Sequence, residues 1–244
     1  MRSPDHPHSR FQWGTKTYLM GIMNITPDSF SGDGLMAPLT LPDSPAPSQT
    51  PVWESLEERM KAVLAQARRF VAAGVDILDV GGESTRPGAQ SVSVKEEMSR
   101  VLPAVRVLAN EFDVLISVDT YKASVADAAL HAGAGMVNDV WGLRADPELA
   151  AVIARHNAWV VLMHNRSSWS HAEIRERLGG RYVGMAYENL LADIQRELLE
   201  SVAIAHAAGI PDEHIILDPG IGFGKTVEQN LELLDRLGEI CALG

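Results

Sequence analysis

Six short apolar runs recur along the chain, and each one ends in polar residues. The strands they predict cover residues 19–24, 75–80, 114–119, 135–139, 159–164 and 214–218. A series of apolar strands that each end in polar residues is typical of a parallel barrel, whose catalytic side chains stand at the carboxyl ends of the strands. The pattern therefore predicts an α/β enzyme of the TIM-type (β/α)8 class, with about six βα units in this chain.

Segments with helical period lie between these strands. Residues 54–73 carry an apolar face that begins at Leu56 and stops before Gly74. A second helix is expected around Met98 to Leu108 with a kink at Pro103, and another is expected to begin at Asp146 as N-cap. A long helix is expected over 184–208 and a last one near 227–240. A closed barrel needs eight such units.

Composition narrows the class of protein. The 244 residues are 46% hydrophobic with a mean hydropathy of −0.02, which suits one globular domain spanning 1–244. A net charge of −11 argues against a nucleic-acid partner, because phosphate binding needs a basic field. One cysteine, no signal-like N-terminus and no apolar run near 18 residues predict a cytoplasmic protein without disulfides or membrane spans.

Two segments fall outside the alternating pattern. Residues 1–16 read as an N-terminal tail. Residues 37–53 contain five prolines and no periodicity, so they predict a mobile loop after the first strand. A tolerated surface insertion is the simplest interpretation of this loop, ahead of a docking ligand for another protein.

The segment GGESTRPG, residues 81–88, directly follows the second predicted strand. Its glycines allow close backbone approach, Thr85 offers a hydroxyl, and Arg86 supplies a planar cation suited to phosphate. An ordinary turn with a surface arginine explains the same residues about equally well.

The segment DPGIGFGKT, residues 218–226, superficially resembles a P-loop. That motif requires glycine where Pro219 stands, and the dinucleotide pattern requires glycine where Lys225 stands, so both are rejected. What remains is Asp218 at a strand end, followed by a glycine loop carrying Phe223. A carboxylate and a ring suit the N–H groups and the flat face of a heterocycle.

Asp119 and Asn138 end two further strands and suit the same task. Together with Asp218 they form a set that can bind the edge of a guanidine-like ring such as a pterin. Taken singly, Asp119 could be only a helix N-cap and Asn138 only a turn residue. Asn24, at the end of the first strand, could supply an amide oxygen to Mg²⁺ alongside ligand phosphates, or could simply form a turn before Pro27. His164 has no partner at metal-ligand spacing in the sequence and is interpreted as a polar core residue.

Six sequence blocks in order resemble the signatures of the dihydropteroate synthase family. They are MNITPDSFS (23–31), GGESTRPGA (81–89), SVDTYK (117–122), VND (137–139), LMH (162–164) and LDPGIGFGKT (217–226). The resemblance implies a TIM-type barrel that joins 6-hydroxymethyl-7,8-dihydropterin pyrophosphate to 4-aminobenzoate, releasing pyrophosphate and forming dihydropteroate for folate synthesis. It implies an SN1-like loss of pyrophosphate, with no dedicated nucleophile.

The resemblance also assigns roles to residues of this chain. Asp119, Asn138 and Asp218 would bind the pterin edge, with Met163 and Phe223 near its faces. Asp119 and Asp218 would stabilise the developing cation, and Arg86 with Thr85 would contact the pyrophosphate. Asn24 would contact Mg²⁺. Phe30, Ser31 and Pro87 would complete the aminobenzoate pocket. The family also implies a homodimer, usually assembled through C-terminal helices.

The chain departs from the family pattern in two places. The family usually has SFSDGG where this chain has Ser31-Gly32-Asp33-Gly34. The family's SRKS and R-x-H blocks, which supply a lysine, an arginine and a histidine, do not occur before Gly244. The expectation from the sequence is therefore a barrel domain without strands seven and eight.

Two other functions remain open from the sequence. A truncated, non-catalytic pterin-binding homologue would also lack the last two blocks. A corrinoid-type pterin-dependent methyltransferase would share the barrel and the strand-end Asp and Asn residues, but it would not require TPDSFS or ESTRPG, and both are present.

Overall fold

The computed structural model describes residues 11–26, 55–83, 91–166 and 186–243. Several sequence predictions fall outside these ranges: the loop at 37–53, most of the tail at 1–16, and the site residues Phe30, Ser31, Thr85, Arg86 and Pro87. The architecture below concerns the described residues only.

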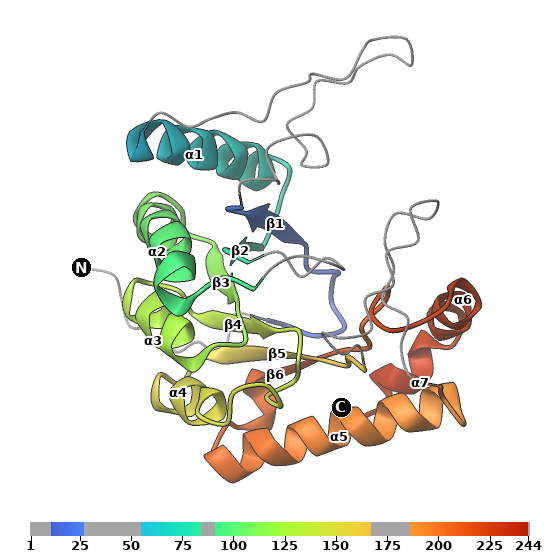
Figure 1. Ribbon diagram of the computed structural model, residues 1–244. Helices are drawn as coiled ribbons and strands as arrows, with labels where there is room; N and C mark the ends of the chain where they lie inside the picture. Colours follow the sequence, from blue (N-terminus) through green and yellow to red (C-terminus); the bar gives the residue numbers. More distant parts are fainter. Residues whose placement is uncertain (1–10, 27–54, 84–90, 167–185, 244) are drawn as a thin grey trace.

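Six parallel strands form one sheet in the order β1-β2-β3-β4-β5-β6 (Figure 1). They are β1 (Met20–Asn24), β2 (Ile77–Gly81), β3 (Leu115–Asp119), β4 (Met136–Asp139), β5 (Trp159–Met163) and β6 (Ile215–Asp218). Every predicted strand is confirmed to within two residues at each end. Among the described strands, β1 pairs only with β2 and β6 only with β5.

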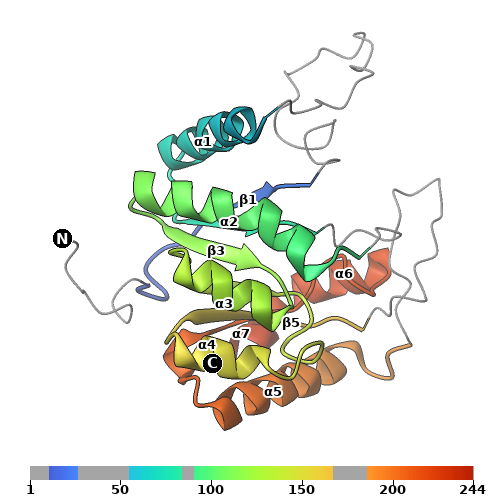
Figure 2. The same cartoon turned by 60° about the vertical axis from the view of Figure 1, so that its left-hand side comes forward.

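Helices follow the strands along one face of the sheet, as both views show (Figures 1 and 2). They are α1 (Leu56–Ala72), α2 (Val94–Glu111), α3 (Ala123–His131), α4 (Leu149–Arg155), α5 (Leu190–Ala208), α6 (Val227–Asp235) and α7 (Leu237–Cys241), with a 3-10 turn at Asp212–His214. This alternation is that of six βα units of a barrel.

Local side-chain caps explain several helix starts. Ser55 accepts from the backbone N–H of Glu58 at the start of α1, and Thr226 forms a capping box with Gln229 at the start of α6. Helix α5 ends at Gly209, whose φ of 91° is left-handed and suits glycine. The end of α5 agrees with the helix end at 208 that the sequence predicts, whereas the caps Ser55 and Thr226 were not predicted.

Three details of the helix prediction are wrong. Helix α5 begins at Leu190, after the cap Asn189, and not at 184. The last predicted helix is two helices, because Arg236 leaves helical geometry. Leu56 is 54% exposed and lies off the buried face of α1. Helix α2 continues through Pro103.

Asp146 lies two residues before Glu148, the N-cap of α4. Its carboxylate accepts from the backbone N–H of Glu148 at 3.0 Å, so it stabilises the turn that leads into α4, as the sequence predicts. Its other oxygen accepts from the backbone N–H of Ala123 at 2.8 Å, at the start of α3. The sequence identified the local capping role of Asp146 but not this second partner, which is 23 residues away.

The sheet separates two apolar clusters. The larger one packs strand residues such as Leu78, Val80 and Val118 against the helices. The smaller one joins Ile77, Leu115, Met136, Trp159 and Val161 with Phe11 from the N-terminal segment. The ring of Phe11 meets that of Trp159 edge to face at 4.7 Å. We call the side of the smaller cluster the inner face, and the N-terminal aromatics cover its lower end.

The inner face is less covered at the edge of the sheet. Ile22 of β1 is 57% exposed, and Ile216 of β6 is only partly buried. Central strands bury both faces, whereas the outer ones leave apolar side chains in solvent. Strands β1 and β6 are therefore the two edge strands of the described sheet. No described helix is long and apolar enough to cross a bilayer.

Candidate active site

Alternation along the strands directs the predicted polar residues to one side. Residues two apart in a strand face the same way, so counting in twos from the inner cluster reaches the carboxyl ends on the inner face. The positions reached are Asn24, Gly81, Asp119, Asn138, Met163 and Asp218. The side chains predicted to form one site therefore share one surface.

Strand register aligns four of these residues. Asn24 pairs with Gly81, Gly81 with Asp119, and Asp119 with Asn138 across four strands. Gly81 makes the row compact, because a Cβ there would lie 3.1 Å from Asn24 Oδ1 and 3.3 Å from Asp119 Oδ2. On the other side, Met163 pairs with Asp218. We call these six residues the strand-end row.

Asp79 lies one layer below the row and was not singled out by the sequence as a site residue. It is buried, and its Oδ2 accepts from Asn138 Nδ2 at 2.9 Å. Only the NH₂ end of an amide can donate to a carboxylate, so this bond fixes the orientation of the Asn138 side chain. Asn138 is thus a strand residue with a defined buried partner, and the turn interpretation is wrong.

Asp119 is not the helix cap that the alternative interpretation required. The N-cap of α3 is Lys122, and the Ala123 N–H is bonded to Asp146. Burial raises the pKa of Asp119 well above its ordinary value, and the nearby carboxylates of Asp79 and Glu97 raise it further. A carboxyl group in that setting gains most from a ligand that brings N–H donors or positive charge.

Asp218 stands at the other side of the row and is similarly desolvated. Burial raises its pKa, while the backbone N–H of Gly220, at 2.7 Å, and the charge of Lys225 oppose that shift. Gly220 has a φ of 70°, and a Cβ there would collide with the carbonyl oxygen of His164 at 2.0 Å. Glycine is therefore required for the turn that orients Asp218.

Lys225 stabilises the backbone of the glycine loop that follows Asp218, a role that the sequence did not reveal. Its Nζ donates to the carbonyl oxygens of Gly220 and Phe223 at 2.9 and 3.0 Å. Burial lowers its pKa to about 8, against the opposing charge of Asp218. These bonds fix the backbone of the loop that carries half-buried Phe223. The available sequence signal for this role was a lysine inside a glycine-rich loop.

His164 is confirmed as a polar core residue. Its Nε2 lies 3.1 Å from Glu197 Oε2 and its Nδ1 lies 3.2 Å from Lys225 Nζ. Burial, and then the charge of Lys225, lower its pKa to about 4. The imidazole is therefore neutral near pH 7 and accepts at one nitrogen while donating at the other.

Lys122 contacts residues from two described stretches of the chain. Its ammonium is ion-paired with Glu83 and, at 2.6 Å, with Glu97, and it donates to the carbonyl oxygen of Val92 at 2.7 Å. In the sequence, Glu83 and Val92 lie on either side of residues 84–90. One lysine therefore joins the two described flanks, and we call Lys122, Glu83 and Glu97 the lysine triad.

A cleft of about 670 Å³ lies beside the strand-end row and is lined by Trp141, Arg144, Asn165, Arg166, Asp193, Arg196 and Glu197, among others. Its arginines are matched by carboxylates: Arg166 bonds Glu197 at 2.8 Å, and Arg196 bonds Asp193 at 2.8 Å. Because these charges satisfy one another, the strand-end row is the better candidate for a ligand that brings N–H donors.

Comparison with known proteins agrees with this geometry. Residues 52–244 match the family described as pterin binding enzyme. The chain is 43% identical to a dihydropteroate synthase of Clostridium beijerinckii, over 96% of this chain and 73% of the relative. It is 43% identical to that of Bacillus subtilis, over 97% of this chain and 70% of the relative.

Solved structures give the same answer for the fold. A Clostridium difficile dihydropteroate synthase, crystallised in the presence of pteroic acid, has a TM-score of 0.77 at 40% identity and covers 96% of this chain and 75% of its own. The Xanthomonas albilineans dihydropteroate synthase with 4-aminobenzoic acid has a TM-score of 0.74 at 37% identity, with 94% and 71% covered.

The parallel sheet with its alternating helices and the family match over residues 52–244 together define the class of this protein as a pterin binding enzyme. This chain belongs to the dihydropteroate synthase family, whose members are transferases of folate biosynthesis.

Proposed function

We propose that this chain condenses 6-hydroxymethyl-7,8-dihydropterin pyrophosphate with 4-aminobenzoate to give dihydropteroate and pyrophosphate. The observation that carries the proposal is the strand-end row, in which Asp119, Asn138 and Asp218 share the inner face at the ends of their strands. Relatives with pteroic acid and with 4-aminobenzoic acid support the two substrate classes.

The pterin edge suits the row chemically. A pterin presents an amino group and ring N–H donors, and the two carboxylates are acceptors, while the Asn138 amide can do both. Both carboxylates carry raised pKa values without a ligand, so the donors of the pterin would relieve an electrostatic cost that folding leaves in place. Phe223 and Met163 would flank the ring.

The same carboxylates support bond cleavage. Loss of pyrophosphate from the pterin methylene leaves positive charge on the ring system, and the 4-aminobenzoate nitrogen then attacks that carbon. Asp119 and Asp218 would stabilise this charge, which is larger in the transition state than in the substrate. Arg86 and Thr85 would hold the departing pyrophosphate.

Mg²⁺ is part of the proposal, with Asn24 as its protein ligand. The donors present fit this ion, because Asn24 Oδ1 and Asp119 Oδ2 both lie close to Gly81, which has no side chain. Mg²⁺ prefers oxygen ligands and keeps several waters. When bound, the ion would offset charge on the pyrophosphate oxygens. Asn24 would serve to position the ion at the mouth of the site.

Calorimetry with two ligands tests the proposal. Arg86→Ala should weaken binding of the pterin pyrophosphate at least tenfold and leave the non-phosphorylated pterin nearly unchanged, and chelation of Mg²⁺ should reproduce part of that loss. Asp218→Ala should weaken both ligands. Asp212→Asn, an exposed aspartate on the 3-10 turn, is the matched control and should weaken neither. Equal losses of both ligands in Arg86→Ala would contradict the pyrophosphate role.

A further inference from the structure

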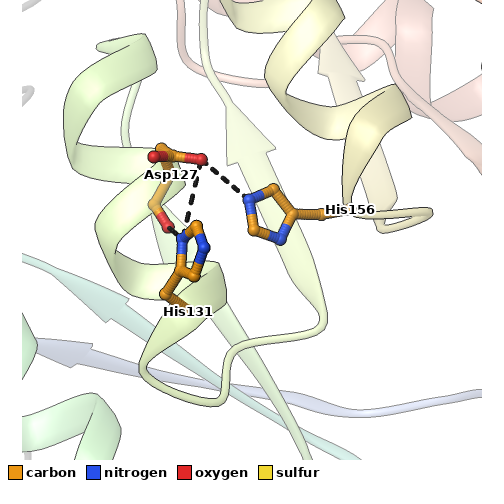
Figure 3. A group of neighbouring side chains, drawn as sticks. All are labelled: Asp127, His131 and His156. Atoms are coloured by element: carbon orange, nitrogen blue, oxygen red, sulfur yellow. Dashed lines mark hydrogen bonds and ion pairs between the residues drawn. The ribbon is translucent and has the colours of Figure 1, made fainter.

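Asp127, His131 and His156 form a cluster far from the strand-end row (Figure 3). Asp127 and His131 lie one turn apart on α3, so they occupy the same face of that helix. His156 directly follows α4. Both histidines stand at the C-terminal ends of their helices, whereas the site residues stand at the carboxyl ends of the strands. The cluster therefore lies at the opposite end of the βα units.

The geometry of the cluster is that of three converging donors. Asp127 Oδ1 lies 2.8 Å from His156 Nε2 and 3.7 Å from His131 Nδ1, and the three donor atoms all lie within 4.8 Å of one another. The two imidazole rings meet edge to face with centroids 4.6 Å apart. Figure 3 shows both rings turned toward the carboxylate, one from each helix.

Two neutral imidazoles and one carboxylate are a known donor set for zinc. With metal bonds of about 2.0–2.2 Å and tetrahedral angles, the donors of such a site stand roughly 3.3–3.6 Å apart. The separations of 2.8 and 3.7 Å from Asp127 Oδ1 to the two histidine nitrogens bracket that value, and the third separation does not exceed 4.8 Å. Nitrogen donors suit zinc and its transition-metal neighbours and are poor ligands for Mg²⁺ or Ca²⁺.

Exposure gives an ion access to the cluster. The side chain of His131 is 68% exposed and that of Asp127 is 35% exposed, while that of His156 is 18% exposed. His131 Nδ1 also lies 2.8 Å from the backbone carbonyl oxygen of Asp127, and it would exchange that contact for the metal. Water would complete the coordination on the solvent side.

One neighbour competes for the carboxylate. Arg155 Nη2 lies 2.8 Å from Asp127 Oδ1, the same oxygen that contacts His156. A cation already on that oxygen must move aside when a metal binds, so Arg155 would weaken the affinity of the site. This competition gives the site a distinct signature, because removal of Arg155 should tighten metal binding, whereas removal of a ligand should weaken it.

We propose that Asp127, His131 and His156 bind a divalent transition-metal ion of the zinc class and thereby cross-link α3 to α4. The site is separate from the Mg²⁺ position proposed at Asn24 and does not depend on the proposed function. Its effect is on stability, because an ion that binds only the folded chain shifts the unfolding equilibrium in proportion to its concentration over its dissociation constant.

The test uses the untagged 244-residue chain with zinc chloride as the only ligand, in a buffer without chelating ions. Titration calorimetry should give one site per chain, and a hundredfold excess of zinc over its dissociation constant should raise the melting temperature by about 5–10 °C. His156→Ala and His131→Ala should each weaken zinc at least tenfold. Arg155→Gln should bind zinc severalfold more tightly than the parent.

A matched control comes from a second surface pair. His206 lies 2.6 Å from Asp212, so His206→Ala also removes a histidine beside an aspartate, but no third donor of the cluster type adjoins that pair among the described residues. Zinc affinity should be unchanged in this variant. No measurable binding by the parent, or equal affinity in the parent and His156→Ala, would overturn the proposal.

Discussion

The strand-end row and the lysine triad both contain buried acidic groups, but the two regions differ in how the charge of those groups is compensated. In the triad, Glu83 and Glu97 are 5% and 1% exposed, and a single ammonium is paired with both. In the row, Asp119 has a raised pKa, and carboxylates are among its nearest charged groups. The triad is a completed structural contact, whereas the row stores an electrostatic cost that only a ligand relieves.

The comparison teaches how to distinguish structural acids from functional ones in this fold. The two regions are neighbours along the chain, since Asp119 and Lys122 belong to the same SVDTYK block. Only two residues lie between Asp119, whose pKa is raised, and Lys122, which is paired with two glutamates. Mutations should therefore separate binding from stability within one short segment.

Breaking the lysine triad should mainly reduce stability. Lys122→Met leaves two buried carboxylates without their cation, which should cost about 3 kcal/mol of unfolding free energy and lower the melting temperature by roughly 6–12 °C. Lys16→Met is the control, because Lys16 also pairs with an aspartate but is 54% exposed. That variant should lose less than about 1 kcal/mol. Similar losses in both variants would remove the distinction.

Asp119→Asn should act in the opposite way. It should weaken pterin binding by about 1–3 kcal/mol, since an acceptor for ligand N–H groups becomes partly a donor. It should not lower the stability of the free protein. A carboxyl whose folded pKa is raised contributes stability at low pH that is lost as pH rises through that pKa, so the variant should gain on the parent as the pH rises. Denaturant unfolding at pH 4 and pH 8, with calorimetry at pH 7.5, checks both claims. A variant that unfolds more easily than the parent at pH 8 would show that Asp119 is structural.

The smallest effect concerns His164, which links the row to the neighbouring cleft. Its pKa is lowered to about 4 from an ordinary value of 6.5, so the unfolded chain binds the proton first. The stability that this neutral imidazole contributes is full above about pH 6.5 and is lost as pH falls toward 4. His164→Gln should therefore flatten the acid side of the stability profile, measured by urea unfolding between pH 4 and 7. An unchanged profile would mean that other groups set the acid limit.

Much of this molecule follows from its sequence alone. All six strands were predicted to within two residues, because a buried parallel strand needs a nearly continuous apolar run and the chain must turn polar where the strand leaves the core. The same rule identified Asn24, Asp119, Asn138 and Asp218 as strand-end groups. Helix ends such as Gly209 were predicted because caps act within a few residues.

Only the tertiary structure decided which polar groups are paired. Asp146 caps a helix 23 residues earlier, Asn138 is fixed by Asp79 from 59 residues away, and Lys122 reaches Glu83 across 39 residues. Such partners meet because neighbouring strands and helices pack side by side, and one sequence carries no local record of that contact. The sequence thus determines where charge is placed along each strand, and the packing determines whether that charge is satisfied by the protein or left for a ligand.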